Sequence, residues 1–185
     1  MRLIILKTWA FSKYFEVGRG GIDHLLGLDP PREELHSQAF QEFGIDVSPK
    51  ELLSGLLIAD KNWFEENARS KIEERSPQEQ LEFGICYEKT ILTEAGIKAP
   101  EETLARVLKR VQQLYEGITF IIFDDVLLTF KTLKQESFIL GLLTNVAQDM
   151  NPICHKLGLE PYLDFEVTSQ EVGADKPKSP IFLAA

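Results

Sequence analysis

An apolar segment that stops abruptly at two polar residues constrains the fold of this chain more than any other feature. Phe138–Leu143 is apolar apart from one glycine, and Thr144-Asn145 follows it directly. A continuous apolar run of this kind is typical of a strand buried on both faces, as in parallel α/β sheets. Because ligands of open α/β folds bind at the carboxyl ends of such strands, we expect Thr144 and Asn145 to present a hydroxyl and an amide there.

A second segment further along the chain offers a positive charge. Residues 165–169, Phe-Glu-Val-Thr-Ser, predict another strand, and the chain then passes through Gly173 to Lys176-Pro177. Hydrogen-bond donors together with one fixed cation are suited to holding a phosphate or a carboxylate. The simpler alternatives are a Thr-Asn pair that merely ends a strand in a turn, and a lysine that is solvated at the surface.

These two segments resemble the second and third motifs of the haloacid dehalogenase-like (HAD) hydrolase superfamily. In that resemblance Thr144 matches the hydroxyl that holds a phosphoryl oxygen, with Asn145 beside it, and Lys176 matches the lysine that pairs with nucleophile and substrate. The order of the motifs and the helix predicted between them also agree. The resemblance extends from about Pro31 to Ala185 and leaves the first thirty residues outside it.

The segment from 31 to 117 predicts several amphipathic helices and no strand. Ser-Pro-x-Glu sequences at 48–51 and 76–79 each combine a capping hydroxyl, a proline at the first helical position and a glutamate three residues after the serine. Glycines at 44 and 96 supply helix stops. The buried stripe of the helix that starts near Pro49 is expected to comprise Leu52, Leu53, Leu56 and Leu57.

The position of this helical segment matches the cap of the HAD resemblance. Such a cap closes over the active site, and the alternative is a helical subdomain with no gating function. From 118 to 185 apolar runs alternate with helical periodicity, beginning with Phe120–Phe123, which is the doubly wound α/β pattern. We therefore predict an incomplete Rossmann-like parallel-sheet core with an inserted helical cap, and expect the first core strand within residues 1–30.

The attacking carboxylate of the family's first motif is the part that is hard to find. Leu3-Ile4-Ile5-Leu6 could form the first strand, but Lys7-Thr8-Trp9 follows it where the family's Asp-x-Asp would stand. Asp23 is a weaker candidate, since Leu25 occupies the place of its second carboxylate. Asp124-Asp125 follows an apolar run, but its position before the second-motif strand favours the start of a helix. Glu171 and Asp175 are expected to cap a helix or face solvent.

The family's late acidic motif, which binds Mg²⁺, would lie beyond Ala185. The resemblance implies Mg²⁺ as a cofactor, but Mg²⁺ favours several hard oxygen ligands and we expect no metal site in this chain. Consequently we expect the chain to be impaired or inactive. A different reading frame or splice form is a further explanation of the divergent residues 1–30.

Composition limits the classes of partner that the chain is expected to bind. The 185 residues carry a net charge of −9, which argues against binding to nucleic acid or to anionic membrane surfaces. Cys86 and Cys154 stand in no metal or redox motif and are expected to be buried or semi-buried free thiols of a cytoplasmic protein. His24, His36 and His155 are expected to be structural or surface residues.

Taken together, the resemblance implies a phosphatase of a small phosphorylated metabolite in intact relatives, or else a haloacid dehalogenase. The alternative from another class is a noncatalytic module on the same scaffold, in which the helices bind a protein partner or a second copy of the chain.

Overall fold

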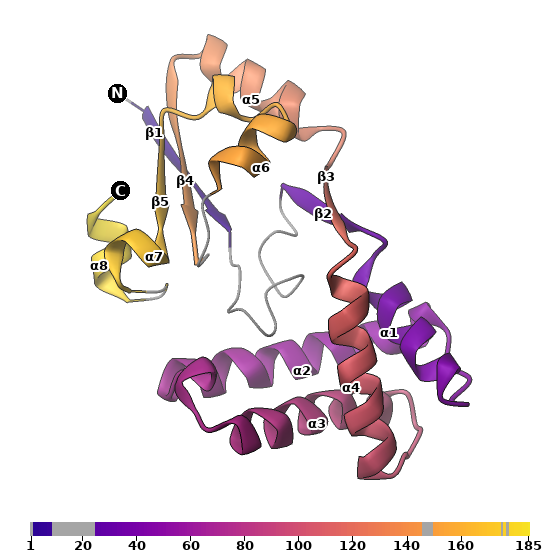
Figure 1. Cartoon of the computed structure of the whole chain (residues 1–185). Helices are drawn as coiled ribbons and strands as arrows, with labels where there is room; N and C mark the ends of the chain where they lie inside the picture. Colours follow the sequence, from indigo (N-terminus) through magenta and orange to yellow (C-terminus); the bar gives the residue numbers. More distant parts are fainter. Residues whose placement is uncertain (1, 9–24, 146–149, 175, 177) are drawn as a thin grey trace. The chain divides into compact units, whose positions relative to one another are not determined.

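Two compact units make up the structure, a computed structural model that describes residues 2–8, 25–145, 150–174, 176 and 178–185 (Figure 1). The first unit combines Met1–Asp29 with Phe120–Ala185, and the second is Pro30–Thr119. The helices predicted over 31–117 lie in the second unit. Their function as a cap stays a prediction.

A three-stranded parallel sheet forms the centre of the first unit (Figure 1). Its middle strand, β4 (Phe138–Thr144), pairs with β1 (Arg2–Thr8) on one side and with β5 (Phe165–Thr168) on the other. This arrangement confirms the prediction of a parallel-sheet core. β1 lies in the segment 1–30, where we expected the first core strand.

The carboxyl ends of the three strands meet at one edge of the sheet. In the parallel register, Thr8 lies opposite Thr144, and Thr144 lies opposite Thr168. Earlier in the same register, Gly141 lies opposite Phe165, and a β-carbon at Gly141 would collide with the Phe165 ring. Because glycine has no side chain, the ring can lie across β4 at this point.

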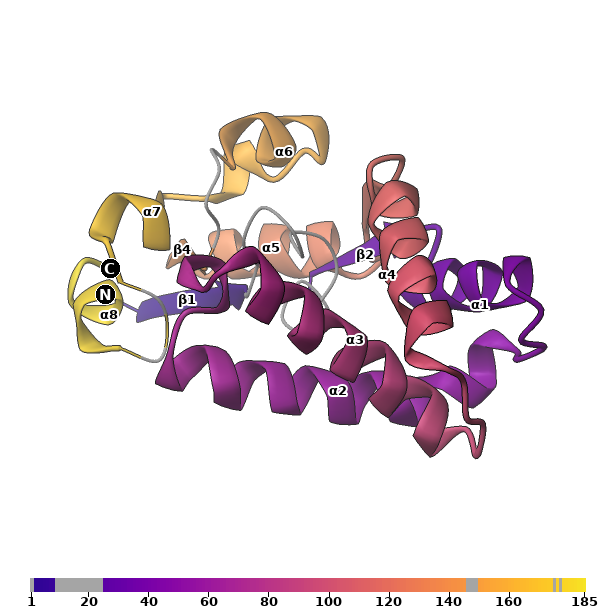
Figure 2. The ribbon, with the colours of Figure 1, turned by 60° about the horizontal axis from the view of Figure 1, so that its bottom comes forward.

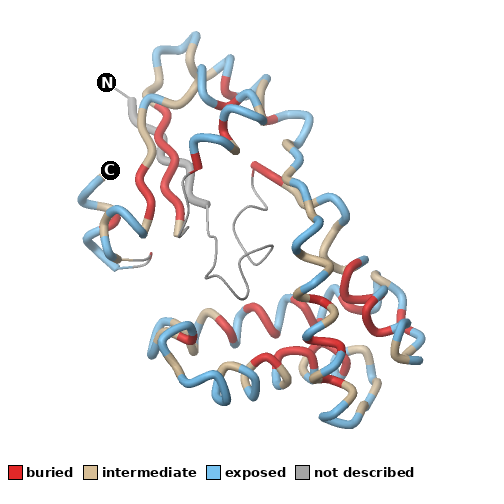
Figure 3. Tube along the Cα trace, viewed as in Figure 1, coloured by how far each residue is buried: buried red, intermediate tan, exposed pale blue. Residues whose placement is uncertain are grey.

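Side chains of β4 enter a core on each face of the sheet. Leu140 and Leu142 belong to one buried cluster, which also contains residues of α5 (Val126–Gln135) and α6 (Asn151–Lys156). Leu143 belongs to another, with Val167 of β5 and Ile181 of α8 (Ser179–Leu183). Figure 3 shows β4 as a continuously buried strand along most of its length. Burial on both faces explains why its sequence is almost uniformly apolar.

The strand that precedes α5 does not join this sheet. β3 (Thr119–Ile122) pairs instead with β2 (Leu26–Asp29) in a separate two-stranded sheet, and the Phe123 N–H donates to the Leu25 carbonyl at 3.2 Å. The alternation of apolar runs suggested that this segment continued the doubly wound pattern. Hydrophobicity predicts that a short apolar run forms a strand, but it does not specify which strand lies beside it.

Asp164 prolongs the pairing of β4 with β5. Its N–H donates to the Leu140 carbonyl at 2.8 Å, and its carboxylate accepts from the Leu140 N–H at 2.8 Å. The ammonium of Lys134, in the last turn of α5, donates to both carboxylate oxygens at 2.6 and 2.8 Å. The bonds from Lys134, followed by the one from Leu140, hold the pKa of Asp164 below its usual range.

Four α-helices make up the described part of the second unit: α1 (Arg32–Glu42), α2 (Pro49–Arg69), α3 (Pro77–Glu94) and α4 (Glu101–Tyr115).

The predicted capping boxes are present. The Glu79 carboxylate accepts from the Ser76 N–H at 3.0 Å and from its hydroxyl at 2.6 Å, and these bonds lower the pKa of Glu79. Gly44 and Gly96 take φ values of 79° and 76°, which glycine adopts without strain.

The buried stripe of α2 differs from the expected one. Leu52 and Leu56 are buried, whereas Leu53 and Leu57 are 45% and 67% exposed. Ala59 and Trp63 continue the stripe instead. The sequence alone does not show which of four leucines within six residues are buried, because burial depends on the helices that pack against this face.

The buried side of α2 lies against α3, and the two helices run side by side (Figure 2). A β-carbon at Gly55 would lie 2.7 Å from the Cα of Ile91 and 2.9 Å from its carbonyl carbon. Both of these atoms belong to the main chain of α3. Gly55 therefore permits a close approach of the two helices, and a side chain there would force them apart.

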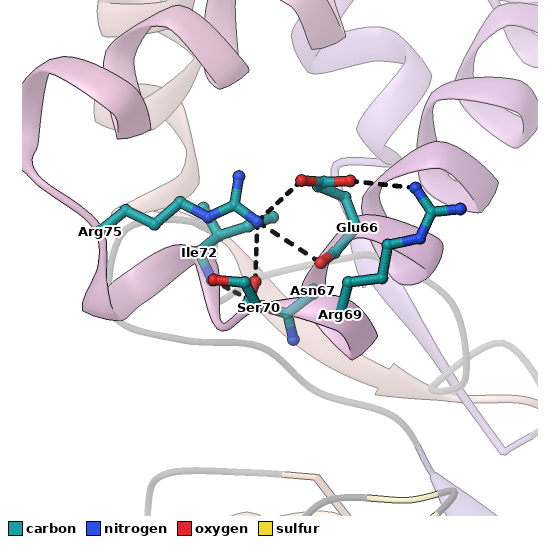
Figure 4. Close-up of polar contacts among 6 residues, drawn as sticks. All are labelled: Glu66, Asn67, Arg69, Ser70, Ile72 and Arg75. Carbon is teal, nitrogen blue, oxygen red and sulfur yellow. Dashed lines mark hydrogen bonds and ion pairs between the residues drawn. The ribbon is translucent and has the colours of Figure 1, made fainter.

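Polar contacts fix the turn between α2 and α3 (Figure 4). The Arg75 guanidinium donates to the Glu66 carboxylate at 3.0 Å and to the Ser70 carbonyl at 2.8 Å, near the carboxyl end of α2. The Ile72 N–H donates to the Asn67 side chain at 3.0 Å. An arginine at this position satisfies carbonyl groups that the end of a helix leaves without partners.

Two smaller findings concern the thiols and the membrane. Both cysteines are free; Cys154 is buried, but Cys86 is exposed, so the expectation of burial or partial burial is wrong for Cys86. No helix within the described residues is both long enough and apolar enough to cross a bilayer.

We predict that Gly55→Ala destabilises the helical unit by about 1–3 kcal/mol, because the new methyl group overpacks the contact between α2 and α3. Helix propensity alone would make the variant more stable, since alanine is favoured over glycine by about 1 kcal/mol in a helix interior. Urea unfolding followed by far-UV circular dichroism measures the difference. Gly117→Ala is the matched control, because its nearest neighbouring atom would lie 3.7 Å away. Unchanged or raised stability of Gly55→Ala would contradict the close approach.

We predict that Asp164→Asn lowers stability at neutral pH and not in acid. The carboxyl pKa is lowered in the folded state, so its stabilising effect is fully present above the unfolded value of about 3.8 and is lost as the pH falls through the lower folded value. Urea midpoints of wild type and variant should therefore converge as the pH drops below that value. If the difference between the two urea midpoints persisted in acid, the charge of Asp164 would not be the cause of the lost stability. Glu136→Gln, an exposed position of the same unit, is the control.

Candidate functional site

Thr144 ends β4 and is fully buried at the edge where the strands' carboxyl ends meet. Its hydroxyl oxygen has no hydrogen-bond partner among the residues that the structure describes. Buried hydroxyls in proteins usually have partners, so a hydroxyl without one among the described residues needs an explanation. An oxygen atom of a ligand would supply the missing partner.

Lys176 reaches the same strand end from a different part of the chain. It lies between α7 (Ser169–Val172) and α8, and only 2% of its surface is exposed. The ammonium donates to the Leu143 carbonyl at 2.7 Å. The alternative of a solvated surface lysine does not agree with this burial, and the two motifs predicted from sequence converge on consecutive residues of β4.

Asn145 connects the two motifs through its side chain. Its carboxamide oxygen accepts from the Lys176 N–H at 2.7 Å, and its carboxamide nitrogen donates to the Lys176 carbonyl at 3.1 Å. The sequence predicted that Asn145 binds phosphate, and that stays a prediction. Its contacts with the Lys176 main chain were not foreseen, because nothing in the local sequence indicates a partner 31 positions away.

Thr168 occupies the corresponding end of β5, but its hydroxyl is used within the protein. It accepts from the Glu171 N–H at 3.2 Å, while the Glu171 carboxylate accepts from the Thr168 N–H at 3.1 Å. The pair forms a capping box at the start of α7. The expectation that Glu171 caps a helix is confirmed, and Asp175 lies outside the described residues.

Within the described ranges, the register of the sheet places no attacking carboxylate opposite Thr144. The residue opposite Thr144 in β1 is Thr8, and the sequence Lys7-Thr8-Trp9 contains no acid. Asp23, the weaker candidate, lies outside the described residues. Asp125 immediately precedes α5, and its carbonyl accepts from the Thr129 N–H at 2.9 Å, in agreement with a helix start. The described residues therefore provide the groups that could hold an anion and not a nucleophile.

A magnesium ion does not fit the described side chains. Within the described ranges, no three His, Cys, Asp or Glu side chains come together in a way that could hold a metal. Two of the carboxylates near the sheet have other functions: Asp164 binds Lys134, and Glu171 caps α7. Because Mg²⁺ requires several oxygen ligands, we derive no chemical step through it.

A buried polar cluster in the helical unit was missed by sequence reasoning. The Arg32 guanidinium pairs with Asp60, and the Tyr87 hydroxyl donates to the same carboxylate at 2.6 Å. Burial disfavours the charge on Arg32, but the attraction and hydrogen bond of Asp60 together with the attraction of Tyr87 and Tyr115 outweigh it and raise the pKa of Arg32. His36 Nδ1 lies 3.1 Å from Glu88, and both side chains are fully buried.

One of the three histidines belongs to this cluster. His36 is structural, as expected, and His155 is exposed, while His24 lies outside the described residues. The available signal was the occurrence of charged residues on faces that are otherwise apolar: Arg32, His36, Asp60 and Glu88. Such residues are seldom fully buried without a partner.

A family model for haloacid dehalogenase-like hydrolases matches residues 16–185. The chain belongs to this family. The match begins upstream of Pro31, so our expectation that the first thirty residues lie outside the resemblance is wrong for residues 16–30.

Individual relatives of this HAD-like hydrolase are distant. The rhythmically expressed gene 2 protein of Drosophila melanogaster is 29% identical over 134 residues, which are 67% of this chain and 51% of that protein. The chain thus spans about half the length of this curated relative.

Solved structures with similarity include YfnB from Bacillus subtilis, named as a HAD-hydrolase bound to magnesium. It is 18% identical, with 99% of this chain and 71% of YfnB covered and a TM-score of 0.49. Another, from Thermotoga maritima and named as a β-phosphoglucomutase, is 17% identical, with 100% of this chain and 68% of that chain covered and a TM-score of 0.46.

We predict opposite stability effects for two threonine-to-valine substitutions at the sheet edge. Thr144→Val should be neutral or stabilising, because the hydroxyl that it removes has no partner within the described structure and the methyl group is apolar. Thr168→Val should cost about 1 kcal/mol, because it removes the cap of α7. Urea unfolding of the two variants provides the comparison. A substantial loss for Thr144→Val would show that its hydroxyl already has a structural function.

Proposed function

We propose that this HAD-like hydrolase uses Thr144 and Lys176 to hold the phosphoryl group of a small phosphorylated metabolite, and that it hydrolyses the ester poorly or not at all. The single observation that carries the first part is the burial of Lys176, whose ammonium donates to the Leu143 carbonyl. The next residue in the chain is Thr144, whose hydroxyl has no hydrogen-bond partner among the described residues. A cation and a hydroxyl at one strand end complement a phosphoryl group that has several acceptor oxygens.

Electrostatics supports an anionic ligand despite the acidic chain. The formal net charge of −9 repels anions at long range, but salt screens such fields beyond roughly 8–10 Å. Inside a site with little solvent, a single ammonium has a stronger effect than distant carboxylates. Net charge therefore limits the rate of encounter with a phosphate ester more than it limits the affinity.

The second part of the proposal rests on the described residues alone, which place no attacking carboxylate opposite Thr144. Phosphoryl transfer to an aspartate requires a carboxylate beside the groups that bind the phosphate. β1 ends with Lys7 and Thr8 and carries no acid at that end, and the described residues form no metal site that could neutralise charge in the transition state. Positioning of a phosphate without attack gives binding and not turnover.

We predict that the wild-type chain binds inorganic phosphate and that Lys176→Met weakens binding by about 10-fold or more, since a charge-assisted hydrogen bond is worth about 1.5–3 kcal/mol. Methionine keeps the length of the side chain and limits damage to packing. Lys178→Met is the matched control, because Lys178 lies two residues away and is exposed. Phosphorus NMR titration or calorimetry gives the dissociation constants. Equal losses for both lysines would refute a specific site.

The same preparations test turnover and the alternative function. With p-nitrophenyl phosphate and Mg²⁺, we expect no hydrolysis above the level of Lys176→Met. Magnesium-dependent hydrolysis that Lys176→Met abolishes would overturn the proposed inactivity and leave phosphate recognition intact. A well-folded wild type that binds no phosphate would favour the noncatalytic module, and light scattering after size exclusion would then test for self-association.

A further inference from the structure

Asn145 holds the main chain of Lys176 at both of its polar groups. The side-chain oxygen accepts the Lys176 N–H at 2.7 Å, and the side-chain nitrogen donates to the Lys176 carbonyl at 3.1 Å. A carboxamide that pairs with both groups of one residue reproduces the pairing of two strands. Two such bonds fix the direction of the Lys176 main chain as well as its position.

The lysine is thereby attached at two points, one on β4 and one on the residue that follows it. Its main chain binds Asn145, and its ammonium donates to the carbonyl of Leu143 at 2.7 Å. These two attachment points flank Thr144 in the sequence. Each attachment therefore limits how far the ammonium can move from the strand end that carries the Thr144 hydroxyl.

No regular element of the described structure spans Lys176, which lies between the end of α7 at Val172 and the start of α8 at Ser179. A lysine side chain has four flexible carbons and loses considerable conformational entropy when its ammonium is held in place. Contacts that fix the main chain already remove part of this conformational entropy, so less of it is lost when a ligand binds. Pre-organisation of this kind increases affinity without a new ligand contact.

We propose that Asn145 is a positioning residue that acts through Lys176, and that its effect on phosphate binding disappears when the lysine is replaced. This inference rests on the proposed function of the site, which it deepens by separating the group that meets the phosphate from the group that holds it in place. It also differs from the sequence-based expectation, in which Asn145 itself binds phosphate.

The first experiment needs no ligand. Lysine acetylation under native conditions, resolved by mass spectrometry, reports the accessibility of each ammonium. In the wild type Lys176 should react slowly because it is 2% exposed, and the exposed Lys178 should react fast. Asn145→Ala should raise the rate at Lys176 by about 10-fold, which corresponds to the loss of about 1.4 kcal/mol of protection, and leave Lys178 unchanged.

Two further variants separate positioning from general loss of stability. Thr168→Val removes the cap of α7 without touching Asn145, so its Lys176 rate should remain low. Asn145→Asp keeps an oxygen for the Lys176 N–H but turns an oxygen toward the carbonyl, so its rate should be intermediate. An unchanged Lys176 rate in Asn145→Ala, or an equal rise in Thr168→Val, overturns the inference.

The second experiment is a double-mutant cycle on the dissociation constant for inorganic phosphate. Asn145→Ala should weaken binding about 5-fold or more when Lys176 is present and less than about 2-fold in the Lys176→Met background, which is the non-additivity expected of residues that act together. If Asn145→Ala weakened phosphate binding just as strongly in the Lys176→Met background, Asn145 would contact the phosphate directly and the inference would be overturned. A wild type that binds no phosphate would refute the proposed function, and acetylation would still decide the positioning effect.

Discussion

The pairing of β4 with a parallel strand on each side determines where every candidate site residue lies. Each ladder fixes the register residue by residue, so the strand ends at Thr8, Thr144 and Thr168 lie beside one another. A shift of one residue would reverse the faces to which Leu142 and Leu143 point and remove both from their cores. The packing of apolar side chains on both faces therefore also positions the polar edge.

Local signals in the sequence identified most elements correctly. A capping box such as Ser76 with Glu79 forms within one turn, and a left-handed glycine such as Gly96 needs no distant partner, so both can be recognised in a linear chain. Features that depend on a partner could not be recognised. The exposure of Leu57 follows from the packing of α2 on α3, and the pairing of β3 with β2 follows from the chain's path. For the same reason, the sequence predicted Lys176 as a site residue but gave no sign that Asn145 binds its main chain.

Buried charge in the helical unit raises a different physical question. Replacing a buried ion pair by apolar residues is often neutral or stabilising, so stability alone does not account for Arg32 with Asp60 or for His36 with Glu88. These pairs join α1 to α2 and α1 to α3. An arrangement that separated either pair would leave a buried group without its partner, at a cost of several kcal/mol. The polar pairs thus favour one relative placement of helices whose apolar faces could otherwise slide along each other.

Separation of binding from attack changes what measurements on this chain would mean. In an active hydrolase, KM contains the rate of chemistry, and the loss of a lysine affects both the ground state and the transition state. A chain that holds a phosphate without attacking it yields a true dissociation constant. Differences among variants of Thr144, Asn145 and Lys176 then report ground-state recognition alone. Comparison with the same substitutions in a relative that hydrolyses phosphate esters would show how much of each residue's effect arises only when the phosphoryl group is transferred.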